Sequence, residues 1–304
     1  MAKVNWQGVY PALTTKFKED HSLDIPAFQK HLDFQLNNGI HGVILAGSLG
    51  EASTLQLQET LELLAAAKEK TDDDTPVLIN IAESNTASAV EIAKAAEAAG
   101  ADGLMLLPPM RYKADDHETV VYFKTIADCT DLPIMIYNNP HDYKIAVTID
   151  MFEQLTLHPN IQAVKESSRD ITNITRMINA FGSRFKIMGG VDTLALECLV
   201  AGADGWVAGL VNAFPEETVT IFNLVKKGRI DDALKIYRWF MPLLELDIHP
   251  KLVQYIKLAE AAAGVGTERV RPPRLKLSGI ERIQVLSVIN DAIQSRPNLK
   301  IYNL

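Results

Sequence analysis

Eight short apolar runs alternate with helix-like stretches up to residue 228, and this alternation limits the possible folds more than any other feature. The runs lie at residues 9–14, 42–46, 77–81, 103–107, 134–138, 162–165, 186–189 and 205–208. They are continuously apolar, as is typical of parallel strands that are buried on both faces. The sequence therefore predicts an α/β fold with a parallel sheet.

Helical periodicity fills the intervals between these runs, at residues 25–36, 55–70, 87–98, 117–129, 149–157, 171–180, 193–200 and 216–227. The segments 38–45, 99–106 and 201–208 repeat one junction, in which a glycine suits the left-handed end of a helix and an apolar strand follows. Eight such units predict a (β/α)8 TIM barrel over residues 1–228. A doubly wound sheet is the alternative, but residues 10–15 lack its glycine-rich phosphate loop.

After Gly228 the alternation stops, and residues 230–246, 250–263 and 279–293 all have helical periodicity. We therefore expect a C-terminal helical extension over residues 229–304, in the same structural unit as the barrel because no low-complexity linker precedes it. It would pack on the barrel or serve in assembly. The stripe of Trp239, Phe240, Leu243 and Leu246 indicates helix core or a subunit contact.

Composition and short motifs exclude several classes of function. The net charge of −8, without a block of lysine and arginine, argues against partners such as nucleic acid or anionic membrane. No apolar run is long enough to cross a bilayer, and the N-terminus lacks the apolar core of a signal peptide. The only cysteines, Cys129 and Cys198, suit reduced thiols and a cytoplasmic location. No metal-binding motif is present, so we expect no metal site.

Polar residues follow the predicted strands at their carboxyl ends, where the active site of such a barrel lies. Lys165 and Tyr137 end neighbouring strands, so they should point into one mouth. A lysine amine that loses its proton there attacks carbonyls to form a Schiff base, and a phenol can shuttle protons. The alternatives are a lysine that reaches water or pairs with Glu166, and a tyrosine that only fills the core.

Other residues at these ends suit a small carboxylate substrate. Gly47, Ser48 and Leu49 form a loop that offers a hydroxyl and backbone N–H groups to a carboxylate. Ser48 could instead be the N-cap of a following helix. Gly190 would let substrate approach the backbone, and Asn139 is a polar residue near the mouth. Together these residues predict a site for a 2-keto acid or its cyclic imine.

GSLGE at 47–51, YNNP at 137–140, KESS at 165–168 and GGVD at 189–192, in this order, resemble the dihydrodipicolinate synthase / N-acetylneuraminate lyase family of class I aldolases. The resemblance covers nearly the whole chain. It implies a (β/α)8 barrel, a covalent Schiff base without any further cofactor, and usually a homotetramer, with a dimer as the alternative. It makes Lys165 the Schiff-base residue, Tyr137 the acid/base, and Ser48 with the Leu49 N–H the carboxylate clamp.

The departures from the family pattern argue against lysine biosynthesis. Dihydrodipicolinate synthases have two threonines where this chain has Ser48 and Leu49, so the usual threonine relay to Tyr137 is interrupted. Asp142 stands where those synthases carry an arginine for the semialdehyde carboxylate, and Met110 replaces a tyrosine that often crosses the subunit interface. These losses leave no cation in those two positions for a second carboxylate.

The stretches at 8–15, 108–115, 205–217 and 237–258 resemble the hydroxyproline-catabolic branch of the family, the 1-pyrroline-4-hydroxy-2-carboxylate deaminases. This resemblance implies conversion of that cyclic imine to 2-oxoglutarate semialdehyde and ammonia. The alternatives are a 2-keto-3-deoxy sugar acid aldolase or dehydratase and a dihydrodipicolinate synthase-like pyruvate aldolase. A catalytically inactive barrel that acts as a sensor or scaffold is a further alternative, although such a barrel has no need of both Lys165 and Tyr137.

Overall fold

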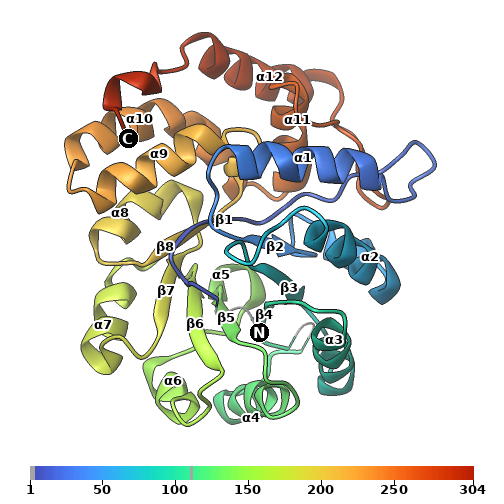
Figure 1. Cartoon of the computed structure of the whole chain (residues 1–304), viewed down its shortest axis with the longest axis vertical. Helices are drawn as coiled ribbons and strands as arrows, with labels where there is room; N and C mark the ends of the chain where they lie inside the picture. The colour runs from blue at the N-terminus through green and yellow to red at the C-terminus, as the bar shows by residue number, and fades with distance from the viewer. Residues whose placement is uncertain (1–3, 110–111) are drawn as a thin grey trace.

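The computed structural model describes residues 4–109 and 112–304, and eight parallel strands form its centre. They are β1 (Gly8–Pro11), β2 (Val43–Leu45), β3 (Val77–Ile81), β4 (Gly103–Leu106), β5 (Ile134–Asn138), β6 (Ile161–Glu166), β7 (Lys186–Gly189) and β8 (Gly205–Ala208). Each strand pairs with its neighbour in sequence, β1 pairs with β8, and a bridge between Ala12 and Ile44 joins β1 to β2. The sheet thus closes into a barrel (Figure 1), which confirms the predicted TIM barrel.

Helices surround the barrel on its outside (Figure 1). They are α1 (Ile25–Asn37), α2 (Leu57–Lys68), α3 (Thr86–Ala98), α4 (Asp116–Ala127), α6 (Ile149–Leu155), α7 (Thr172–Phe181), α8 (Ala195–Val200) and α9 (Pro215–Lys226). The sequence signals explain where they begin: the Asp24 carboxylate accepts a hydrogen bond from the Ala27 N–H at the start of α1. Periodicity missed α5 (Pro140–Tyr143), η1 (Ala52–Thr54) and η3 (Leu210–Asn212), because single turns are too short to show it, while η2 (Asp192–Leu194) forms the start of the helix predicted at 193–200.

The C-terminal segment is helical, as predicted, and its helices gather on one side of the barrel, in orange to red in Figure 1. It contains α10 (Ile230–Leu244), η4 (Glu245–Ile248), α11 (Leu252–Ala262), α12 (Gly279–Gln294) and η5 (Leu299–Tyr302). Phe240 is fully buried and packs edge-on against Phe214, with ring centroids 5.7 Å apart. Leu243 on α10 and Leu246 on η4 are buried as well, so these three members of the predicted stripe are helix core, and Trp239 is half-buried.

Buried ion pairs hold α11 against the barrel. Lys257 on α11 donates to the carboxylate of Glu51, which follows β2, and Lys16 donates to Glu260, also on α11. All four side chains are buried. Because removing one partner of a buried pair leaves an uncompensated charge, these contacts fix how α11 and the preceding η4 sit at the barrel.

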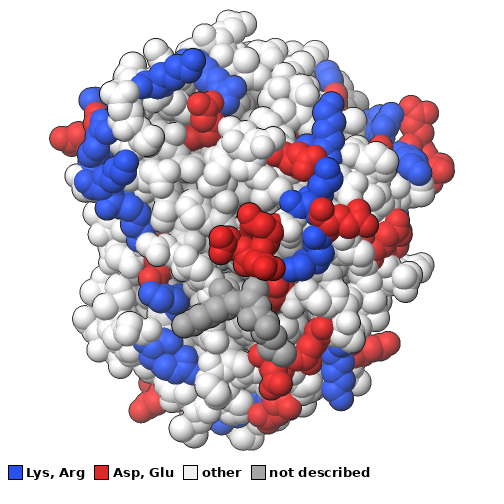
Figure 2. Space-filling model, viewed as in Figure 1, with Lys and Arg blue, Asp and Glu red and all other residues white. Residues whose placement is uncertain are grey.

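Over the described ranges, the surface charges, the helices, the potential metal ligands and the cysteines point to no further functional site. Figure 2 shows acidic and basic side chains scattered between large uncharged areas on one face. In the described part of the chain, no helix is both long and apolar enough to cross a membrane. Residues 4–109 and 112–304 also contain no group of three His, Cys, Asp or Glu side chains that could hold a metal ion. Cys129 and Cys198 are both free.

Candidate active site

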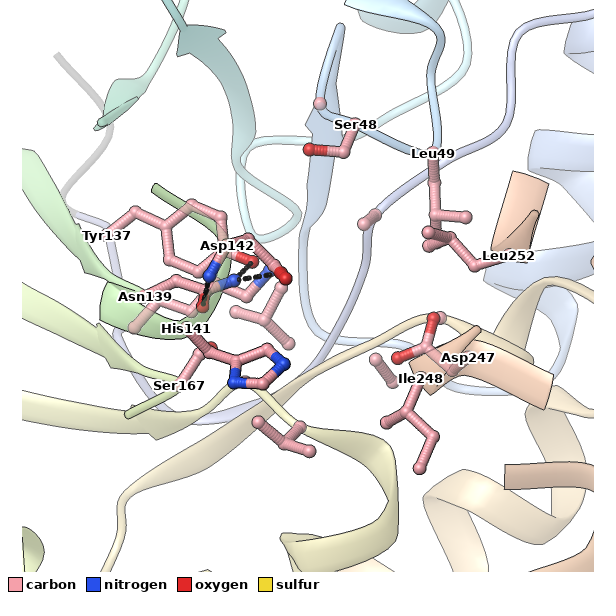
Figure 3. A pocket seen from close by; sticks show the side chains of 18 of the residues that line it. Ser48, Leu49, Tyr137, Asn139, His141, Asp142, Ser167, Asp247, Ile248 and Leu252 are labelled. Carbon is pink, nitrogen blue, oxygen red and sulfur yellow. Dashed lines mark hydrogen bonds between the residues drawn. The ribbon is translucent and has the colours of Figure 1, made fainter. Parts of the chain in front are cut away.

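A cavity of about 400 Å³ opens at the carboxyl ends of the strands. This volume is in the range of small-molecule sites. The walls come from the loop after β2, from β5 and β6, from the loops after β7 and β8, and from the segment between η4 and α11 (Figure 3). All the residues predicted from the sequence line it, namely Gly47, Ser48, Leu49, Tyr137, Asn139, Lys165 and Gly190.

Lys165 lies on β6 directly beside Tyr137 on β5, and its Nζ is 4.0 Å from the centre of the tyrosine ring. The lysine is only 7% exposed, so it does not extend to bulk water. It does not pair with Glu166 either, because that carboxylate accepts hydrogen bonds from the Asn138 amide at 3.0 Å and from the Ser168 N–H at 2.7 Å. Both alternatives raised for this lysine are therefore wrong.

Gly190 has a role that the sequence did not reveal, because the absence of a side chain at this position makes room for Lys165. A Cβ atom at position 190 would lie 2.6 Å from Cγ and 2.7 Å from Cε of Lys165. Real Cβ atoms do not come this close to their neighbours. The missing side chain thus lets the lysine lie flat against the end of β7 and places its amine beneath Tyr137.

Burial lowers the pKa of Lys165, because an ammonium group loses the solvation that stabilises its charge. The nearby acidic groups of Tyr143, Asp247 and Asp192 act in the opposite direction but do not cancel this effect. A larger share of the amine is therefore neutral near pH 7 than for an exposed lysine. Only the neutral amine attacks a carbonyl or imine carbon.

Tyr137 is almost fully buried, and burial raises its pKa to about 12. Near neutral pH it therefore holds its proton and can act first as a donor. The Asn139 side-chain amide donates to the Tyr137 hydroxyl at 3.2 Å and to the Asp142 carboxylate at 2.7 Å. Asn139 thus fixes the orientation of both groups, and Figure 3 shows the three side chains on one side of the cavity.

The loop after β2 carries the predicted carboxylate clamp. The Ser48 hydroxyl is 2.9 Å from the Tyr143 hydroxyl, while α2 begins after Gln56, so the alternative role of Ser48 as a helix N-cap is wrong. Among the described residues, the backbone N–H groups of Ser48 and Leu49 have no acceptor. The Leu49 side chain is buried and lies toward Leu252 (Figure 3). The two N–H groups and the serine hydroxyl can bind a carboxylate.

Five titratable side chains that sequence reasoning did not place there also line the cavity, namely His141, Tyr143, Arg169, Asp247 and His249. Arg169 brings a cation to the cavity from a position other than the two, 110 and 142, for which the sequence predicted none. Tyr143 ends the single turn of α5, six residues after Tyr137 on β5, and the two rings meet edge-on with centroids 5.7 Å apart. The sequence did contain one signal that could have placed Asp247 at the site: the polar segment DIHP at 247–250 interrupts two apolar helices. Met110 lies outside the described residues.

Comparisons with known proteins agree in pointing to one family. A sequence model of the Dihydrodipicolinate synthetase family matches residues 5–292. The 4-hydroxy-tetrahydrodipicolinate synthase of Methanoculleus marisnigri is 31% identical over 290 residues, which cover 93% of this chain and 98% of the relative. A crystal structure of the dihydrodipicolinate synthase DapA-2 from Bacillus anthracis superposes with a TM-score of 0.91 at 26% identity, over 97% of this chain and 100% of the other.

Proposed function

The chain belongs to the dihydrodipicolinate synthetase family, and from this premise we propose that it is a Schiff-base deaminase that converts 1-pyrroline-4-hydroxy-2-carboxylate to 2-oxoglutarate semialdehyde and ammonia. Enzymes of this family are of the lyase type and use a covalent Schiff base with a lysine and no external cofactor. The observation that carries the proposal is the buried Lys165 amine under the Tyr137 ring, in one cavity with the Ser48 clamp.

In the proposed reaction the substrate carboxylate binds the hydroxyl of Ser48 and the N–H of Leu49, which places C2 of the ring at the Lys165 amine. The amine adds to C2, and the ring opens as the C2–N bond breaks. Tyr137 gives its proton to the departing ring nitrogen, and its phenolate then removes a proton from C3. The resulting enamine expels the 4-hydroxyl group.

The remaining steps move the unsaturation and release the products. A proton shifts from C5 to C3, which leaves an enamine, and protonation at C4 converts it to an imine at C5. Water hydrolyses this imine to an aldehyde and ammonia, and a second water hydrolyses the Schiff base and frees Lys165. Since the elimination releases one water, the reaction consumes one water in total. No oxidant or reductant is required.

The runner-up function is condensation of pyruvate with aspartate semialdehyde, as in a dihydrodipicolinate synthase. The relatives that carry the synthase name favour it, and Arg169 at the cavity could receive the second carboxylate. Against it, the Asp142 carboxylate lines the same cavity and would repel that group. A sugar-acid aldolase is a third candidate. We propose a homotetramer for the assembled enzyme, which light scattering can test.

Trapping the Schiff base separates these candidates. The protein is incubated in turn with pyruvate, the hydroxylated pyrroline carboxylate and 2-keto-3-deoxy sugar acids, and is then reduced with borohydride and weighed by mass spectrometry. A coupled semialdehyde dehydrogenase and an ammonia assay report turnover of the pyrroline. Release of ammonia and semialdehyde supports the deaminase. Formation of pyruvate from a sugar acid, with the pyrroline untouched, would refute it.

A further inference from the structure

Asp247 is an acidic group in the cavity for which the reaction above has no role. It lies on η4, in the C-terminal segment, and its carboxyl group points into the cavity from the side opposite Asn139 and His141 (Figure 3). Within the part of the chain that the structure describes, its carboxyl oxygens accept no hydrogen bond. A half-buried acid that faces a substrate cavity and has no protein partner is available to the substrate.

The backbone at the end of β8 makes room for this carboxyl group. A Cβ atom at Gly209 would lie 2.9 Å from Cγ of Asp247, so only a glycine allows the acid to pack against the barrel rim at this point. The buried ion pairs of α11 with the barrel hold the adjoining η4 in the same place. The packing of the C-terminal helices against the barrel therefore determines the position of Asp247.

The charged groups that act on Asp247 are Asp192 on η2, Asp142 on α5 and Lys165 on β6. Burial raises the pKa of Asp247 well above its usual range, and the two other carboxylates raise it further, while Lys165 acts in the opposite direction. The carboxyl group therefore holds its proton to a higher pH than an exposed aspartate does. This suits a group that donates a proton during catalysis.

The proposed reaction needs such a donor at one step. Hydroxide is a poor leaving group, so the 4-hydroxyl must receive a proton as its bond to C4 breaks. Tyr137 sits beside Lys165 and serves the atoms next to the Schiff base, C2 and C3. C4 is one bond farther from the Schiff base than C3, so a second proton donor can serve it.

We propose that Asp247 is the general acid that protonates the departing 4-hydroxyl group. This inference rests on the proposed function, because it concerns a substrate with a hydroxyl group two carbons from the Schiff base. The C4–O bond breaks, the electron pair of the enamine forms the C3–C4 double bond, and the Asp247 proton leaves with the hydroxyl as water. A proton released when water hydrolyses the protonated Schiff base later returns the Asp247 carboxylate to its acid form.

The test uses the full-length Asp247→Asn protein, because asparagine keeps the size of the side chain but cannot act as an acid. Turnover of the hydroxylated pyrroline should fall roughly 10²–10⁴-fold, the range for a general acid. Borohydride trapping of pyruvate on Lys165 and exchange of pyruvate methyl protons with D₂O should stay within threefold of wild type, since neither involves a leaving group. Asp142→Asn is the matched control, and its loss of turnover should be at least tenfold smaller.

A substrate analogue with fluorine in place of the 4-hydroxyl group distinguishes an acid from a binding residue. Fluoride leaves without a strong proton donor, so the Asp247→Asn protein should process the fluoro analogue nearly as well as wild type does. Turnover of the hydroxyl substrate within threefold of wild type, an equal loss with both substrates, or loss of pyruvate trapping would each overturn the assignment. If the wild-type protein itself eliminates no hydroxyl group, the proposed function fails, and this inference fails with it.

Discussion

Replacing Gly190 by alanine tests whether the contact between this glycine and Lys165 places the reactive amine. The added Cβ would lie 2.6 Å from Cγ of the lysine. Carbon atoms pack at roughly 3.5 Å, so the lysine side chain would have to move by about 1 Å. A displacement of about 1 Å at a reacting group lowers turnover roughly 10²-fold, which is the loss we expect.

The same substitution has a separate effect on stability. Overpacking of a buried site destabilises a protein by about 1–3 kcal/mol. The new Cβ also meets the hydroxyl of Ser167, which is buried without a hydrogen-bond partner in the described structure. The double variant Gly190→Ala/Ser167→Ala removes this second clash, so it should recover part of the lost stability without recovering the position of Lys165.

Two measurements test this prediction. One is the rate at which borohydride traps pyruvate on the protein, and the other is urea unfolding monitored by circular dichroism. The single variant should be folded, modestly destabilised and slow to trap, and the double variant should be more stable but equally slow. A Gly190→Ala protein that traps pyruvate within threefold of wild type would refute the argument, because it would show that Lys165 keeps its reactive position without the glycine.

The remaining predictions concern the chemistry and the C-terminal segment. Lys165→Ala should abolish trapping of any substrate, and a mass increase in that variant would show that another amine reacts. In the wild type, trapping should slow as the pH falls, because protonation removes the neutral amine, and the lowered pKa of Lys165 should place this loss at a lower pH than for an exposed lysine. Tyr137→Phe should fold normally and lose turnover roughly 10²–10⁴-fold in the coupled assay; near-wild-type turnover would reduce the tyrosine to a packing role. The protein should condense pyruvate with aspartate semialdehyde poorly because of Asp142, and the Asp142→Arg variant should do so faster; rapid condensation by wild type would contradict this. Lys257→Met should lower the free energy of unfolding by up to about 3–5 kcal/mol, because the buried Glu51 loses its lysine partner and keeps only the Arg271 N–H and the more distant Arg274 guanidinium; an unchanged urea midpoint would mean that this pair does not hold α11 against the barrel.

The strands, the helices and the neighbouring positions of Lys165 and Tyr137 could be predicted from the sequence, because each depends on local patterns. A continuous apolar run and the helical periodicity around it reflect which faces are buried, and this holds for any chain that folds as a barrel. The barrel rule then places the end of every strand at one mouth. Lys165 and Tyr137 follow directly, since they end neighbouring strands in register.

Only the tertiary structure decided which distant side chains join that pair. Tyr143 contacts Ser48, 95 residues away, because the single turn of α5 folds back over the cavity, and one turn leaves no periodic signal. Asp247 reaches the cavity because buried ion pairs fasten α11 to the barrel, and no local pattern records a pairing between residues 206 positions apart. The sequence therefore determined the scaffold and the proposed nucleophile, whereas long-range packing determined which acidic side chains and which hydroxyl group surround that lysine.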